Sequence, residues 1–361
     1  MGPWNAPVID CDGHLVESIP EMAEYMDPTI KGMATNPSRN RSGVFPGLDG
    51  IHYPRESEIP EEQKEKAREY VTASDHRKGS GEDIVAFQQK AGLEASVLFA
   101  SEALSVGFIQ QTDYAVRVCR AYNDYVADRY RGVSDKLYPL GIIPMQNAEA
   151  AVVELRRLVV ELDLKGAMLP SLGLSLHFGH DYYWPVYKEA ASLNAVLGIH
   201  GGSSIGFGAD TFTSAWAARA VRHPVPLLLA MASMVYHDVL DTFPGFKIGF
   251  FEGGAAWPAL LLDRMERDDE VYTTGTGTKR PLRSYFESGQ VLIGCEGNED
   301  ILTYLSGKVG VEAFGWASDY PHEVDVVAAN HMIQETFDRD DMSHDEKAAI
   351  MGGNARRFFG L

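Results

Sequence analysis

The sequence predicts an α/β fold of the (β/α)8 barrel class, with insertions after the first and fifth strands. Eight short apolar runs recur along the 361 residues, and each ends in polar or glycine-rich residues and is followed by a helical pattern. The runs are almost continuously apolar, as expected for parallel strands that are buried on both faces. A doubly wound sheet would show the same alternation, but no run is followed by a GxGxxG motif. The number of runs and this missing motif favour the barrel.

Each apolar run is expected to be one strand of the barrel. The strands are expected at residues 6–10, 95–100, 137–144, 166–170, 195–200, 247–252, 290–294 and 314–319. Between them, apolar residues at helical spacing indicate amphipathic helices that pack against the strands. These helices are expected at residues 112–131, 148–162, 183–193 and 257–265.

Two long segments interrupt this alternation. Residues 27–82 follow the first strand and are rich in Gly, Pro, Asn and charged residues, and residues 201–226 follow the fifth strand and begin with a glycine-rich stretch. Structureless loops of this length are uncommon, so we expect each insertion to be a lid or an interface arm. Barrels of about 250 residues and more are common as one domain, so residues 1–361 are expected to form a single domain.

The composition is that of an acidic globular protein. Hydrophobic residues make up 45% of the chain and charged residues 23%, which excludes a disordered chain. The 51 acidic and 32 basic residues give a net charge of −19, which argues against a nucleic-acid or anionic-membrane surface. The 3 cysteines are too few for a disulfide framework. No leader or membrane-spanning run of about 20 apolar residues is visible, so a cytoplasmic location is expected.

Residues with metal-binding side chains stand at the ends of several predicted strands. The first strand ends in Asp12 and His14, the fifth in His200, the sixth in Glu252 and the eighth in Asp319. In a parallel barrel the carboxyl ends of the strands share one face, where active sites are built. Asp12 and His14 are two residues apart and therefore point to the same side of a strand. This mixture of imidazole and carboxylate favours Zn, Mn or Fe over an all-oxygen magnesium site.

Five motifs along the chain resemble those of a known family. They are IDCDGH at residues 9–14, GIHGG at 198–202, FPGFKI at 243–248, ASDYPH at 317–322 and GNARRFFGL at 353–361. Together they resemble the amidohydrolase superfamily, specifically its amidohydrolase-related branch, which includes the aminocarboxymuconate semialdehyde decarboxylase-like enzymes. The resemblance implies a barrel in which the first-strand motif, the histidine of the fifth strand and the aspartate of the eighth bind a metal.

The chain departs from the pattern of this branch at two positions. The metal-binding decarboxylases of the branch usually carry His-x-His or Glu-x-His at the first strand, where this chain has Asp12 and His14. At the end of the sixth strand the branch commonly carries a histidine that acts as acid or base, where this chain has Glu252. The second departure weakens the case for a decarboxylation or hydrolysis that relies on an imidazole at that position.

Carboxylates replace the missing imidazole, and the candidate ligands are numerous enough for two metal ions. The complete set is Asp12, His14, Glu17, His200, Glu252, Asp319 and His322. A carboxylate-rich pair of this kind resembles the dinuclear non-haem iron or manganese–iron centres that activate dioxygen. A small group within the branch, similar to isobutyrate hydroxylase and related di-iron monooxygenases, carries such a site on this fold.

The favoured function is therefore O2-dependent hydroxylation of a small organic acid by an Fe or Mn/Fe pair. One alternative is a mononuclear Zn or Mn hydrolase or non-oxidative decarboxylase, with Asp319, Glu252 and His322 as the catalytic acid and base groups. Another alternative is a non-catalytic subunit that pairs with an active paralogue. The expected partners are the small organic acid and a second copy of the chain or a paralogue, with neither nucleic acid nor membrane.

Simpler roles remain open for three of the candidate ligands. Glu17 is also suited to the first turn of a helix, where a carboxylate is favoured by the helix dipole. Glu252 could accept a hydrogen bond from a ligand histidine instead of binding the metal. His322 could cap a helix or line the pocket. Further candidates for contact with the substrate are His177, His180, Arg77, Arg219 and Arg222.

Overall fold

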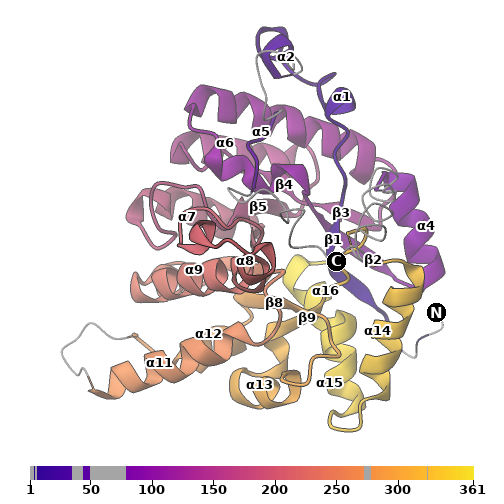
Figure 1. Ribbon diagram of the computed structural model, residues 1–361, viewed down its shortest axis with the longest axis vertical. Coiled ribbons are helices and arrows are strands. Elements are labelled where there is room, and N and C mark those ends of the chain that lie inside the picture. The colour runs from indigo at the N-terminus through magenta and orange to yellow at the C-terminus, as the bar shows by residue number, and fades with distance from the viewer. Residues whose placement is uncertain (1–3, 5, 35–43, 49–78, 272–277, 323) are drawn as a thin grey trace.

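Parallel strands form a barrel at the centre of the protein, and helices lie around it (Figure 1). This computed structural model describes residues 4, 6–34, 44–48, 79–271, 278–322 and 324–361. Its strands are β1 (Ile9–His14), β2 (Ala95–Phe99), β3 (Leu137–Pro139), β4 (Gly141–Ile142), β5 (Gly166–Pro170), β6 (Val196–His200), β7 (Lys247–Phe251), β8 (Val291–Cys295) and β9 (Phe314–Trp316). Only Leu140 separates β3 from β4, so the two together occupy one strand position of the barrel. The predicted eight-strand barrel is therefore confirmed.

Consecutive strands pair in parallel within two hydrogen-bonded sheets, one of β1 to β3 and one of β4 to β9. Beside the break between β3 and β4, the Leu140 N–H donates to the carbonyl of Leu98 over 2.9 Å. At the other seam, the Asp319 N–H donates to the Asp12 carbonyl over 2.9 Å, and the His14 N–H donates to the Tyr320 carbonyl over 2.7 Å. The segment after β9 is therefore bonded to β1, which closes the barrel.

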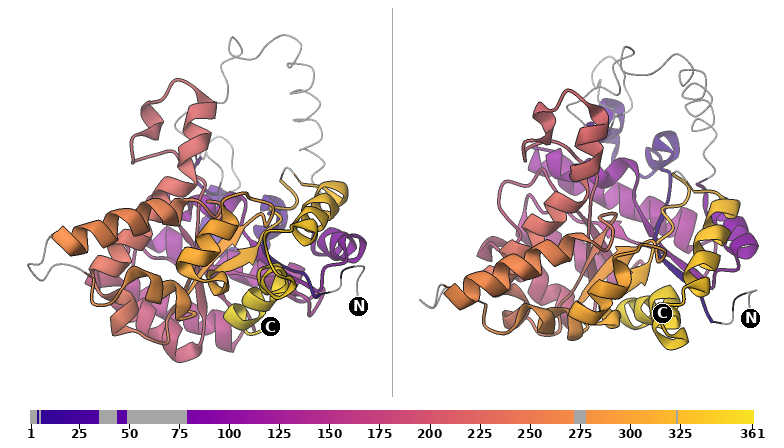
Figure 2. Two further views of the ribbon diagram at one scale, coloured as in Figure 1. Left: turned by 90° about the horizontal axis from the view of Figure 1, so that it is seen from below. Right: turned by 60° about the horizontal axis from the view of Figure 1, so that its bottom comes forward.

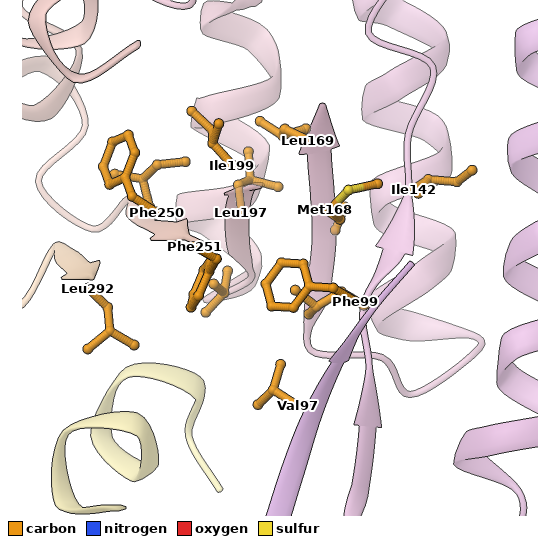
Figure 3. Packing of buried hydrophobic residues seen from close by; sticks show 14 of the residues in the cluster. Val97, Phe99, Ile142, Met168, Leu169, Leu197, Ile199, Phe250, Phe251 and Leu292 are labelled. Carbon is orange, nitrogen blue, oxygen red and sulfur yellow. The ribbon is translucent and has the colours of Figure 1, made fainter. Parts of the chain in front are cut away.

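Two phenylalanine rings fill the barrel beneath the strand ends. Phe99 of β2 and Phe251 of β7 face each other with ring centroids 4.6 Å apart (Figure 3). Two glycines make room for them, because a Cβ at Gly198 of β6 would approach the Phe99 ring to 2.9 Å and one at Gly249 of β7 the Phe251 ring to 2.3 Å. The Phe99 ring also lies 5.1 Å from that of His200, so it supports a side chain of the strand-end face.

Helices surround the strands, as Figures 1 and 2 show. In chain order they are α1 (Ile19–Met22), α2 (Pro28–Ala34), α4 (Gly81–Ala91), η2 (Glu102–Phe108), α5 (Thr112–Val126), η3 (Ala127–Arg131), α6 (Ala148–Val160), η4 (Asp181–Tyr183), α7 (Trp184–Leu193), η5 (Ala209–Thr211), α8 (Ala215–Arg222), α9 (Pro224–Tyr236), α10 (Val239–Thr242), α11 (Trp257–Val271), α12 (Leu282–Glu287), α13 (Leu302–Val309), η6 (Val311–Ala313), α14 (Val326–Asp338), α15 (His344–Ala348), η7 (Ala349–Gly353) and α16 (Asn354–Phe359). The four predicted helices are confirmed, and the last of them, α11, extends beyond its predicted end.

The two predicted insertions contain helices of their own. Of residues 27–82 the structure describes α2, residues 44–48 and the start of α4, and the remainder lies outside the described residues. Residues 201–226 contain η5, α8 and the start of α9. The two insertions touch where the Ser203 Oγ donates to the Leu48 carbonyl over 2.7 Å. Their role as lid or interface arms stays a prediction, as does association with a second copy or a paralogue.

None of the helices in the described part of the chain has both the length and the apolar composition that a membrane span requires.

Candidate metal centre

Four side chains from three parts of the barrel come together at the strand ends. Asp12 and His14 belong to β1, His200 is the last residue of β6, and Asp319 follows β9. The His200 Nε2 lies 3.3 Å from the Asp12 Oδ1, and the His14 Nε2 lies 3.3 Å from the Asp319 Oδ1. The ligand atoms of Asp12, His14 and His200 all lie within 4.8 Å of one another, close enough to share one ion. The structure therefore brings these four predicted residues together, and their role as ligands stays a prediction.

Backbone carbonyls fix which nitrogen of each imidazole carries a proton. The His14 Nδ1 lies 3.0 Å from the Ala100 carbonyl, and the His200 Nδ1 lies 2.7 Å from the Gly201 carbonyl. A carbonyl oxygen can only accept, so in both rings Nδ1 is the donor. Each Nε2 is then the nitrogen that faces the carboxylates, and it can bind a metal once it carries no proton.

Three polar atoms at the centre of this group have no hydrogen-bond partner among the described residues. They are the Asp12 Oδ1, the His14 Nε2 and the His200 Nε2, and all three are buried. Burying unpaired polar atoms is costly, and buried polar groups in proteins almost always have a partner. A divalent cation would satisfy all three at once, and two imidazoles with two carboxylates suit Zn, Mn or Fe. The residues present therefore fit a metal ion.

The pKa values of the two imidazoles are shifted in opposite directions. Burial lowers the pKa of His14 well below its usual range, and the neighbouring His322 and His200 lower it further. Burial also lowers the pKa of His200, but the carboxylates of Asp12 and Glu252 outweigh it and raise that pKa to about 9. Because metal ligands must be deprotonated, binding at His200 has to displace a proton.

His322 lies beside the group with both ring nitrogens engaged. Its Nδ1 is 2.7 Å from the Asp319 Oδ1, and its Nε2 is 3.0 Å from the Ser101 Oγ. Burial lowers the pKa of His322, but the hydrogen bond and charge of Asp319 outweigh it and raise the pKa overall. His14, Asp319 and His322 lie close enough to share an ion. The occupied nitrogens nevertheless favour a donor role for His322 over ligation.

Glu252 stands behind His200 and not among the converging ligand atoms of the described residues. Its Oε2 lies 3.4 Å from the His200 Nδ1 and 3.2 Å from the His223 Nδ1. Burial would raise the pKa of Glu252, but His223, His200 and His14 lower it far below its usual range, which keeps the carboxylate charged. These contacts match the simpler expected role, a partner of a ligand histidine. Direct ligation by Glu252 stays a prediction.

His223 is a member of the site that sequence reasoning missed. It lies between α8 and α9, and its Nε2 accepts from the Arg222 Nε over 2.9 Å, so its Nδ1–H is the group that faces Glu252. The chain can approach here because Gly201 has no side chain: a Cβ there would lie 2.9 Å from the His223 Cα. The glycine pair after His200 was the available signal.

Glu17 is engaged by backbone donors in this structure, and its role as a metal ligand stays a prediction. Its Oε2 accepts the backbone N–H groups of Ser101 and Glu102 over 3.1 and 3.0 Å, and its Oε1 accepts that of Ala103 over 3.0 Å. These donors are at the start of the 3₁₀ helix η2, so Glu17 caps a helix other than its own. Burial raises the pKa of Glu17 to about 7.

Asp10 is a second residue that sequence reasoning missed. Its Oδ1 accepts the Ser318 N–H over 3.0 Å and the Asp12 N–H over 3.2 Å, and its Oδ2 accepts the Ser318 hydroxyl over 2.6 Å. Asp10 therefore ties β1 to the turn that carries Asp319. The signal was its place two residues before Asp12 on a strand, which puts both carboxylates on one side.

The predicted substrate contacts are spread over the molecule. His177 and His180 lie in the segment before α7, where the His177 ring packs 4.4 Å from that of His237. Arg219 and Arg222 lie on α8, and Arg77 lies outside the described residues. A role for any of them in substrate binding stays a prediction.

The fold and these side chains define a barrel with a candidate metal centre at its strand ends, and sequence comparison gives its family. The chain belongs to the amidohydrolase family, whose profile matches residues 9–361. It is 25% identical to the 2-amino-3-carboxymuconate-6-semialdehyde decarboxylase of Dictyostelium discoideum over 71% of this chain and 70% of that protein. It is 24% identical to the gamma-resorcylate decarboxylase of Polaromonas sp. over 77% of this chain and 86% of that protein.

Solved structures share the fold at low sequence identity. An amidohydrolase from Mycobacterium avium subsp. paratuberculosis K-10 gives a TM-score of 0.75 at 17% identity over 99% of both chains. The 5-carboxyvanillate decarboxylase of Novosphingobium aromaticivorans, solved with manganese, gives 0.70 at 17% identity over 99% of this chain and 97% of that one. The predicted fold and branch are confirmed. The predicted Fe or Mn/Fe pair and the monooxygenase chemistry find no support among these relatives, whose named activities are decarboxylations.

Proposed function

We propose that this protein is a metal-dependent, non-oxidative decarboxylase of a small organic acid, with an aromatic carboxylic acid as the preferred substrate class. The observation that carries the proposal is the buried group formed by Asp12, His14 and His200, whose unpartnered atoms call for one divalent ion, with the Asp319 carboxylate beside His14. The nature of the reaction is supported by the curated relatives, which are decarboxylases at 24% to 26% identity.

Asp12, His14, His200 and Asp319 would hold the ion, with Mn or Zn as the metal. When bound, the ion supplies Lewis-acid chemistry that orients the acidic substrate and offsets developing negative charge. Three of the four side chains, those of Asp12, His14 and His200, are buried, and electrostatic effects are stronger there than in water.

Decarboxylation also needs a proton donor, because the carbon that loses CO2 keeps the electron pair of the broken bond. Glu252 is unsuited to that task, since its neighbouring histidines keep it charged. His322 is better suited: it holds a proton at Nδ1 against the Asp319 Oδ1 and lies with its ring centroid 4.1 Å from that of His14. We assign the proton to His322, and we assign to Glu252 the orientation of His200.

The test is an assay of metal-free protein, reloaded with manganese, against 2,6-dihydroxybenzoate and 5-carboxyvanillate under argon. We expect one bound ion per chain and release of CO2 that needs neither oxygen nor a reductant. His200→Ala is the negative control. Product formation that requires O2, with two redox metals per chain, would overturn the decarboxylase assignment.

One observation favours a second candidate, the dinuclear O2-activating hydroxylase. The Glu252 Oε2 lies 3.4 Å from the His200 Nδ1 and 3.2 Å from the His223 Nδ1. This carboxylate and the additional imidazole are on the side of His200 that faces away from Asp12. If the His223 nitrogen beside Glu252 carried no proton, His223 and Glu252 would together form part of a second metal site. Measuring metal per chain and O2 consumption in the same preparation separates the two candidates.

A further inference from the structure

A chain of hydrogen bonds connects Glu17 to the metal-binding carboxylate of Asp319. Glu17 holds the backbone N–H of Ser101 at 3.1 Å. The Ser101 Oγ lies 3.0 Å from the His322 Nε2, and the His322 Nδ1 lies 2.7 Å from the Asp319 Oδ1. The segment after β1, the start of η2 and the turn after β9 are thereby joined at one corner of the centre.

A count of protons gives the direction of these bonds. Ser101 has one hydroxyl proton, and its Oγ donates it to the Leu15 carbonyl over 2.8 Å, because that carbonyl can only accept. The Ser101 Oγ must then accept from the His322 Nε2–H. The other nitrogen of His322 faces the Asp319 carboxylate and donates to it. His322 is a donor at both nitrogens, so it has no lone pair to offer a metal.

We propose that Ser101 is a positioning residue of the metal centre, and that Glu17 acts through it by fixing its backbone. This inference rests on the divalent-metal centre of the proposed function. Ser101 keeps His322 turned so that its Nδ1–H holds the Asp319 Oδ1, which in turn lies 3.3 Å from the His14 Nε2. Partners of this kind orient a ligand and raise metal affinity.

Asp319 needs such support more than the ligands on the strands do. It belongs to the turn after β9, and its backbone has a φ of 57°, in the left-handed region. Asp12, His14 and His200 lie within strands, whereas Asp319 lies outside them and its backbone N–H is bonded to the Asp12 carbonyl. The His322 bond supplies the corresponding restraint for Asp319 through its side chain.

The experiment is a titration of the metal-free protein with Mn²⁺, followed by electron paramagnetic resonance, which reports free and bound manganese without any turnover. We expect Ser101→Ala to bind manganese with unchanged stoichiometry but about 10–100-fold more weakly, the usual effect of removing such a partner. Its bound-Mn²⁺ spectrum should change because Asp319 shifts. Ser101→Thr keeps the hydroxyl and should restore the wild-type affinity and spectrum.

Ser105→Ala is the matched control, because the Ser105 Oγ donates to the Glu102 carbonyl and not to His322. The manganese affinity of this variant should equal that of the wild type. Glu17→Gln should weaken manganese binding in the same direction as Ser101→Ala, again with full stoichiometry. His322→Asn provides a second route if Ser101→Ala unfolds, and it should bind a full equivalent of manganese with the same loss of affinity.

Unchanged affinity in Ser101→Ala would overturn the inference, and so would a loss of stoichiometry in Glu17→Gln or His322→Asn, which would make either residue a ligand. Wild-type protein that binds no divalent metal would overturn the proposed function itself. A metal-loaded wild type without decarboxylase activity would overturn the proposed reaction and leave the positioning result standing.

Discussion

In each ligand histidine, one hydrogen bond to a backbone carbonyl determines which ring nitrogen faces the metal centre. The Ala100 and Gly201 carbonyls accept from the Nδ1 atoms of His14 and His200, so Nε2 is in both rings the nitrogen left for a metal. Because these acceptors are backbone atoms, side-chain substitutions at residues 100 and 201 would not remove them. The histidines themselves are therefore the residues at which metal binding can be tested directly.

His200→Ala should lose metal almost completely. It removes one of the converging ligand atoms, so affinity should fall by more than the roughly 10–100-fold seen when an outer partner is lost. Elemental analysis after dialysis measures the metal retained per chain. His237→Ala is the control, because that exposed ring bonds to the Ser233 carbonyl. Full metal retention by His200→Ala would contradict the assignment of the site.

His223→Ala should lower the turnover number and leave one bound metal per chain. The change removes the imidazole that faces the Glu252 Oε2 over 3.2 Å, and Glu252 is then less well held beside His200. A loss of about 10–100-fold in kcat is expected for such a partner. Parallel measurement of kcat and metal content checks this. Loss of one of two bound ions would instead favour the dinuclear candidate.

The residues found from sequence and those missed differ in how they reach the site. Asp12, His14, His200 and Asp319 could be predicted because strand ends of a parallel barrel meet at one face. His223 could not, because it comes from an insertion with no fixed relation to any strand. Nor could the true partners of Glu17, since its bonds join residues 84 to 86 positions apart.

At the scale of elements, the approach of the α8–α9 junction to β6 depends on Gly201. Gly201→Ala should disturb His223 directly, because the new Cβ would lie 2.9 Å from the His223 Cα and 3.0 Å from its Nδ1. The two backbones must then separate, so we expect kcat to fall with little change in metal content. Steady-state kinetics and elemental analysis measure both quantities.

Gly353→Ala is the matched control for Gly201→Ala. A Cβ at Gly353 would meet its nearest atom at 3.5 Å, which is ordinary contact, and the residue has a helical φ of −59°. Activity should be unchanged there. Equal effects of the two alanines would show that the junction does not act on the site through Gly201.

Most strands and helices were predictable because their periodicity is local. The amphipathic stripe of residues 148–162 yields α6, which begins at an Asn147 cap. The break at Leu140 and the π-helical turn η3 were not predicted, since both depend on neighbouring strands and helices and not on the local pattern. Within the insertions only the position and length were predicted, and the helices α2, η5 and α8 were not.

At the scale of the whole molecule, hydrogen bonds of Asp10 contribute to the closure of the barrel. This buried carboxyl accepts from Asp12 on its own strand and from Ser318 after the last strand, so it links the first and final elements of the barrel. Burial raises the pKa of Asp10 to about 7, although the hydrogen bonds from Ser318 and Asp12 oppose the shift. The folded protein therefore binds this proton more tightly than the unfolded chain.

Asp10→Asn should flatten the pH dependence of stability between pH 4 and pH 7. The raised pKa makes the contribution of Asp10 largest below its unfolded value of 3.8, and the contribution is lost as the pH rises through about 7. The difference amounts to a few kcal/mol, at about 1.4 kcal/mol per pKa unit. Urea unfolding of metal-free wild type and variant across this range measures it. Parallel pH profiles would contradict the prediction.

The sequence predicted the class of enzyme more firmly than its reaction. A barrel with ligands at its strand ends follows from motifs that span nearly the whole chain. The reaction depends on whether Glu252 binds metal or supports His200. The distances that distinguish these roles lie between segments far apart in the sequence, so residue spacing does not predict them.

Both carboxylates that follow β7 and β9 adopt a backbone that suits glycine better. Glu252 has a φ of 62° and Asp319 a φ of 57°, and such conformations cost of the order of 1–3 kcal/mol in a residue other than glycine. Glycine at either position would relieve this cost, but it would also remove a carboxylate from the strand-end face of the barrel. Any stability-guided redesign of the protein should therefore exclude both positions.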